Sequence, residues 1–213
     1  MSETACSRTP TSAGLAGLVL AALALTSGCA TRESLELPEL GGWESRQALL
    51  GQVDEWAFNG RIGVVAGDDG FSGSLRWLQS GDDFEATVSG PLGIGTVRLE
   101  GDGRRVQLID KDGNSTVLED AERDLYRRYG WTIPVRSLRY WALGIPDPAL
   151  PAETDLGGDG YLQSLTQGGW KVDITRYGDG GGQPMPTRLK AASEQTRVKL
   201  AIHKWSFFDQ PGP

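Results

Sequence analysis

Apolar and polar residues alternate through most of this chain, and an alternation of period two is typical of half-buried β-strands. In residues 56–64, for example, Trp56, Phe58, Ile62 and Val64 fall on one side of the predicted strand. Turn signals separate the stretches at spacings of roughly 8–12 residues, the spacing of an antiparallel meander. We therefore expect about ten short strands. Nine of them are assigned to residues 56–64, 71–78, 84–88, 96–100, 106–110, 115–118, 169–177, 187–191 and 197–205.

Three short helices are expected between or before these strands. Residues 43–56 have apolar side chains at helical spacing. Asp120 can cap a helix over residues 121–129, and Ser137 can cap a helix over residues 138–143. With 30 Gly and 11 Pro in 213 residues, long helices are disfavoured.

The strand pattern predicts a mainly β (α+β) fold in which the sheet has one wet face and one dry face. Helices packed on the dry face give either an α+β domain or a curved, incompletely closed barrel with helices on its concave side. Residues 146–160 contain Pro and Gly without apolar alternation, which predicts a loop.

The N-terminus has the features of a targeting segment. Residues 15–25 form an apolar run of 11 residues, whereas a membrane-spanning helix needs about 20. The run is followed by Thr26-Ser27-Gly28-Cys29, which resembles a bacterial lipobox. This resemblance implies cleavage before Cys29, acylation of that residue and, with Ala30 next, sorting to the outer membrane. The alternative is an ordinary secretory signal that happens to precede a cysteine.

These features divide the chain into four parts. Residues 1–28 are the expected lipoprotein signal peptide, and residues 29–42 are the lipidated cysteine with a flexible polar tether. Residues 43–208 contain every predicted strand and helix and no second linker, so we expect one folded domain there. Residues 209–213 form a tail.

Composition excludes several classes of function. With 21 Lys+Arg against 28 Asp+Glu, the net charge of −7 rules out a basic nucleic-acid footprint and argues against electrostatic docking on anionic lipid headgroups. One His and two Cys leave little material for a metal site, a catalytic triad or a disulfide framework. The adjacent carboxylates fall at turns and at a helix start, where Asp is locally useful. We therefore expect that the protein is not an enzyme and that it has no catalytic residue, metal or cofactor.

The segment between the third and fourth strands is unusual. Pro and Gly break the strand pattern at residues 89–95, yet Leu92 and Ile94 are large aliphatic residues where a turn is normally polar. Either these side chains tuck into the core, or Pro91, Leu92, Gly93 and Ile94 form an exposed apolar projection that contacts lipid or a partner.

A set of motifs runs through the chain in a defined order. It consists of Cys29 of the lipobox, Trp56-x-Phe58-x-Gly60-Arg61, Trp77, Gly90-Pro91-Leu92-Gly93-x-Gly95, Ile133-Pro134-x-x-x-Leu138-x-x-Trp141-x-x-Gly144, Gly169-Trp170-x-Val172, Pro184-Met185-Pro186 and Val198-x-Leu200-x-Ile202-x-x-Trp205. In order and spacing this set resembles the LolB family of outer-membrane lipoprotein receptors. The resemblance covers roughly residues 43–206; the Gly-rich stretch at residues 178–182 is longer than in the family.

The resemblance implies an open, half-closed antiparallel β-barrel of about ten or eleven strands, with three short helices covering an apolar cavity. It implies a monomeric chaperone, anchored at the periplasmic face of the outer membrane, that accepts acylated lipoproteins from a LolA-type periplasmic carrier and inserts them into the outer membrane. Because no nucleotide motif is visible, we expect transfer without nucleotide hydrolysis. The family's projecting hydrophobic residue corresponds by motif to Leu92.

Period two also identifies candidate residues for the wall of an acyl-chain cavity. They are Phe58, Ile62, Leu75, Trp77, Phe84, Val172, Ile174, Leu200 and Ile202. A solid core has the same alternation as a lined cavity, so a structural or scaffold outer-membrane lipoprotein without cargo is the alternative. A hydrolase would instead need a polar cleft. An open apolar cavity would favour the lipoprotein receptor. The absence of a cavity would favour the scaffold, and a polar cleft would favour the hydrolase.

Overall fold

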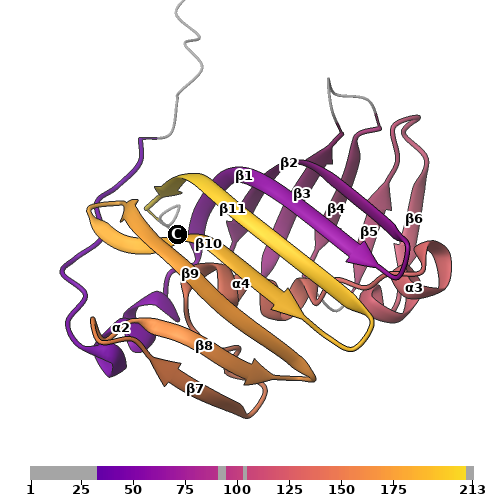
Figure 1. Ribbon diagram of the computed structural model, residues 1–213. Coiled ribbons are helices and arrows are strands. Elements are labelled where there is room, and N and C mark those ends of the chain that lie inside the picture. Colours follow the sequence, from indigo (N-terminus) through magenta and orange to yellow (C-terminus); the bar gives the residue numbers. More distant parts are fainter. Residues whose placement is uncertain (1–32, 91–94, 103–104, 210–213) are drawn as a thin grey trace, which may run out of the picture. The chain divides into compact units, whose positions relative to one another are not determined.

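The computed structural model describes residues 33–90, 95–102 and 105–209. Within these ranges the chain forms one antiparallel sheet of eleven strands with three helices (Figure 1). The strands are β1 (Glu55–Ala66), β2 (Asp69–Ser80), β3 (Asp83–Ser89), β4 (Val97–Gly101), β5 (Val106–Ile109), β6 (Ser115–Leu118), β7 (Ala152–Leu156), β8 (Leu162–Gln167), β9 (Trp170–Gly180), β10 (Gln183–Ala192) and β11 (Thr196–Phe207). The helices are α2 (Trp43–Leu50), α3 (Ala121–Tyr129) and α4 (Val135–Leu143). The expected mainly β architecture is confirmed.

The sheet consists of two meanders that meet at its centre. Its strand order is β6-β5-β4-β3-β2-β1-β11-β10-β9-β8-β7. The first and last strands of the chain pair with each other, with Trp56 opposite Phe207 and Ala66 opposite Thr196. Helices α3 and α4 connect the two meanders, and Figure 1 shows the sheet curving over α4. Strands β6 and β7 are the two edges, so the sheet stays open.

The core lies on the inner face of this sheet. Along β1, Trp56, Phe58, Ile62 and Val64 are buried, as their alternation predicts. Their neighbours include a row of aromatic rings whose centroids lie 4.9 to 6.2 Å apart, which is the range of favourable aromatic contacts. The row is made of Trp56, Phe58, Trp77, Phe84, Trp205 and Phe207.

Two of the three helices differ from the sequence prediction. Helix α2 ends at Leu50 instead of residue 56, because residues from Glu55 onward pair with β2 and β11. Helix α4 begins at Val135 after Pro134, and Ser137 is not its cap. The Ser137 hydroxyl instead lies 2.9 Å from the Asp147 carboxylate. Long-range partners therefore override the local signals at both helices.

Helix α3 has the predicted bounds, and the carboxylate of Asp120 accepts a hydrogen bond from the backbone N–H of Arg123 at 3.1 Å. The predicted loop at residues 146–160 is wrong, because it contains strand β7. All five residues of β7 are exposed on this edge strand, so no apolar alternation reveals it.

The segment before α2 is hydrogen-bonded to the sheet. The backbone N–H of Leu35 donates to the carbonyl of Phe207 at 2.7 Å, and the N–H of Leu37 donates to the carbonyl of Gly181 at 2.8 Å. Ser34 Oγ accepts from the N–H of Phe207, and Leu40 is buried. The predicted signal peptide and Cys29 lie outside the described residues. No described helix is long and apolar enough to span a membrane.

Candidate functional site

An apolar cavity of about 570 Å³ lies between the inner face of strands β2 to β5 and helix α3 with the residues that follow it. Its size is within the range of about 300–1,000 Å³ that is usual for small-molecule sites. Its lining residues are Phe71, Ser72, Val88, Gly90, Gly95, Val97, Leu99, Leu108, Leu125, Trp131 and Ile133. Only the Ser72 hydroxyl and the Trp131 indole N–H are polar side-chain groups in this set, and none of the set is charged.

Strand pairing builds one wall of the cavity. Val88 lies opposite Val97 in the β3–β4 ladder, and Leu99 lies opposite Leu108 in the β4–β5 ladder. Side chains that are directly opposite on one face of an antiparallel pair are close neighbours, so these four aliphatic groups form a continuous surface. Helix α3 supplies the facing wall through Leu125, which is completely buried.

The cavity is open rather than sealed. Phe71, Val88, Val97 and Trp131 line it and are only partly buried. The rings of Phe71 and Trp131 are 5.0 Å apart at an angle of 51°. An open pocket with an apolar wall can admit a hydrophobic chain from outside.

Gly90 and Gly95 both line the cavity. In the sequence they flank the predicted insertion loop of Pro91, Leu92, Gly93 and Ile94. The four loop residues lie outside the described part of the chain. The role of these four residues stays a prediction.

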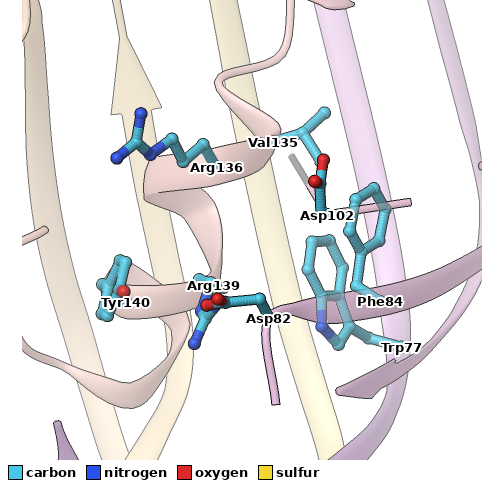
Figure 2. Close-up of a pocket in the computed structure, with 8 residues that line it drawn as sticks. All are labelled: Trp77, Asp82, Phe84, Asp102, Val135, Arg136, Arg139 and Tyr140. Carbon is cyan, nitrogen blue, oxygen red and sulfur yellow. The ribbon is translucent and has the colours of Figure 1, made fainter. Parts of the chain in front are cut away.

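A second, smaller pocket of about 170 Å³ lies between helix α4 and the first meander (Figure 2). Figure 2 shows Arg139 beside Asp82, and the closest atoms of these two side chains are 3.4 Å apart. The Arg139 guanidinium also lies over the Tyr140 ring at 4.8 Å. This pocket is polar and much smaller than the apolar cavity, so it is a poor match for a fatty chain.

The nine cavity residues expected from the sequence all face inward. Each is between 1% and 6% exposed, which the alternation predicts. None of them lines the apolar cavity. All nine belong to the packed core. Trp77 and Phe84 also border the polar pocket, and Ile62 and Leu200 are core residues that sit next to the outward-facing residues of a surface hollow.

Sequence reasoning missed the residues that do line the cavity. Period two identifies the inner face but does not show where that face is left uncovered. The available signal was position: Val97, Leu99 and Leu108 lie on the inner face of the strands just after the unusual loop. Leu125 lies on the predicted helix that follows the first meander.

The described residues contain no group of three or more His, Cys, Asp or Glu side chains that could hold a metal ion.

A family model and individual relatives both indicate the same protein family. A family model described as "Outer membrane lipoprotein LolB" matches residues 54–205. The chain is 36% identical over 192 residues to the outer-membrane lipoprotein LolB of Pseudomonas aeruginosa strain PAO1, which covers 88% of this chain and 94% of the relative. It is 34% identical over 191 residues to the LolB of Nitrosococcus oceani, which covers 88% and 95%.

Solved structures show the same fold at low sequence identity. A LolA superfamily protein from Nitrosomonas europaea aligns with a TM-score of 0.50 at 10% identity, over 80% of this chain and 96% of that chain. A DUF1329 family protein from Desulfovibrio piger aligns with a TM-score of 0.52 at 7% identity, over 76% and 89%. At these identities the likeness concerns the fold alone.

Proposed function

The chain belongs to the LolB family of outer-membrane lipoproteins, and we propose that it accepts acylated lipoproteins from a LolA-type periplasmic carrier and inserts them into the outer membrane. In this proposal it is anchored through Cys29 at the periplasmic face, acts as a monomer and uses no nucleotide hydrolysis. The single observation that supports cargo binding best is the open apolar cavity of about 570 Å³.

The cavity suits the part of a lipoprotein that water rejects. Removing each CH₂ group of an acyl chain from water is favourable by about 0.8 kcal/mol. The aliphatic wall of Val88, Val97, Leu99 and Leu108 offers that environment without any charged group. A scaffold lipoprotein with a solid core would have no use for such a space, so the cavity favours a cargo-binding protein.

Passive transfer requires a descending series of free energies from carrier to receptor to bilayer. A cavity that is open and lined by partly buried residues holds a chain less completely than a sealed one. It can therefore accept a chain and release it again. Gly90 and Gly95, which precede and follow residues 91–94 in the sequence, line the cavity. In this proposal the apolar Leu92 enters the lipid layer as the acyl chain leaves.

A transfer assay without ATP tests the proposal. Purified protein is mixed with a carrier that is loaded with labelled lipoprotein, and the label on each protein is measured. In Val97→Trp the larger side chain occupies the cavity, so we expect acceptance to fall at least severalfold. Val117→Trp is the matched control, because Val117 is exposed on β6. Equal acceptance by folded Val97→Trp and Val117→Trp would contradict the cavity assignment.

The same assay with liposomes tests the loop. We expect Leu92→Glu to accept cargo normally and to fail in delivering it to liposomes, because a charged side chain does not enter the lipid layer. Ser89→Glu is the control for added charge near the loop. Normal incorporation of lipoprotein by Leu92→Glu would show that Leu92 is not needed for release.

A further inference from the structure

The outer face of the sheet carries a group of exposed cations on the strands around its centre. This basic face, as we define it, consists of six residues from β1, β9, β10 and β11: Arg61, Lys171, Arg188, Lys190, Arg197 and Lys199. The ion pairs found among the described residues involve other cations. The six charges are therefore available to a partner from outside the chain.

The pairing register brings these cations together. Lys190 lies directly opposite Lys199, and Arg188 lies opposite Ala201, which in turn lies opposite Arg61. Like charges directly opposite each other destabilise a sheet. The nearest carboxylate in the ladder is that of Asp173, opposite Lys190. Glu153 and Asp155 on β7 lie on the same face, two strands away from Lys171 and Asp173. These three carboxylates do not balance six cations, so an anionic partner would relieve the repulsion.

The basic face also has a shape that suits a phosphate group. A hollow of about 500 Å³ is bordered by Arg61, Arg188, Lys190 and Lys199. Gly63 contributes to its floor, where a Cβ atom would meet only Ser72 atoms and the Phe71 carbonyl, at 3.9 Å or more. The absence of a side chain at Gly63 therefore leaves space between the cations. Arginine and lysine are the usual protein ligands of phosphate.

We propose that the basic face binds the phosphate groups of anionic phospholipids at the membrane surface. It would be a second membrane contact, separate from the lipid anchor and from residues 91–94. Anionic lipid attracts basic residues that lie within about one Debye length of the surface, roughly 8 Å at physiological salt. The six cations lie on one face of neighbouring strands, so they can approach a planar surface together.

Chain length favours a membrane as the partner. Ser34 and Leu35 are hydrogen-bonded to Phe207 at the end of β11, the strand that also carries Arg197 and Lys199. Ser34 lies five positions after Cys29, which corresponds to at most about 18 Å of extended chain. This step alone rests on the anchor proposed above. An anchor at Cys29 would keep the Phe207 end of β11 within that distance of the lipid surface.

Vesicle binding by an unanchored chain tests the proposal. A chain of residues 30–213 keeps the whole sheet, its helices and its core. We expect it to sediment with vesicles that contain phosphatidylglycerol, to bind phosphatidylcholine vesicles much more weakly, and to be released by added salt. The variant Arg188→Gln/Lys190→Gln/Lys199→Gln should bind roughly a hundredfold more weakly, since each basic residue near an anionic surface changes binding about fivefold.

The control removes the same charge elsewhere. Arg105→Gln/Lys111→Gln/Arg123→Gln changes three exposed cations outside the basic face and should bind like the unmodified chain. Equal losses in the two triple variants, or equal binding to both kinds of vesicle, would overturn the proposal. Binding to an acidic protein without binding to phosphatidylglycerol vesicles would overturn it as well. Neither cargo nor carrier is present, so failure here leaves lipoprotein transfer untouched.

Discussion

A single buried arginine holds helix α2 against the second meander. Arg46 is 1% exposed, and its Nη2 donates to the Pro184 carbonyl and contacts the Met185 sulfur. Its guanidinium lies over the rings of Tyr161 and Tyr177, at 5.1 and 5.8 Å. Burial lowers the pKa of Arg46, while the two tyrosines act in the opposite direction. Its Nε and Nη1 have no hydrogen-bond partner within the described part of the chain.

The charge of Arg46 is therefore expected to matter less than its volume. Burying an ion costs free energy that incomplete hydrogen bonding does not recover. We expect the free energy of unfolding of Arg46→Met to differ from that of the unmodified chain by about 1 kcal/mol at most. Arg46→Ala should lower it by about 2–4 kcal/mol, because the substitution leaves a cavity. Urea unfolding measures both. Equal losses in the two variants would show that the polar contacts of Arg46, not its volume, hold α2.

At the scale of elements, a buried glutamine joins helix α4 to strand β8. Gln167 Oε1 accepts hydrogen bonds from Trp141 Nε1 and from the backbone N–H of Asp147, both at 2.9 Å. Its Nε2 donates to the carbonyls of Asp147 and Leu150, also at 2.9 Å. All four hydrogen-bonding positions of the amide are used, so no other residue type replaces it without leaving buried groups unpaired.

Gln167→Leu is therefore expected to lower the free energy of unfolding by about 3 kcal/mol. Each buried group that loses its partner costs about 1–3 kcal/mol, and the total is reduced where water hydrogen-bonds to a group instead. Gln163→Leu, on the same strand but exposed, is the matched control and should have little effect. Urea unfolding of the two variants compares them. If Gln167→Leu were as stable as Gln163→Leu, the network would not be what fixes α4 on the sheet.

The elements that the sequence predicts well are those whose local signals agree with their surroundings. Strand β1 shows clean alternation and is buried on one face, and α3 has an Asp cap that is used as predicted. The failures have physical causes. Edge strand β7 has no apolar alternation, and helix α2 ends early because its last predicted residues pair with two neighbouring strands.

At the scale of the whole folded unit, two properties depend on arrangement and not on composition. A net charge of −7 argues against docking on anionic lipid, yet register brings six cations to one face. Alternation identifies the inward-facing residues, yet it does not distinguish a filled region from a hollow one. The row that includes Trp77 fills one part of the inner face, while Leu99 and Leu108 border open space in another.

In the proposed function, acyl chains occupy the cavity between β2–β5 and α3. Trp131 lines this cavity and is partly buried, so it can report contact with a bound chain. The most direct test is tryptophan fluorescence during transfer of a lipoprotein whose acyl chains carry bromine, a short-range quencher. We predict quenching that Trp131→Phe removes and that Trp170→Phe, a change in the packed core, leaves in place. Quenching that persists in Trp131→Phe, or no quenching while cargo is accepted, would contradict the account.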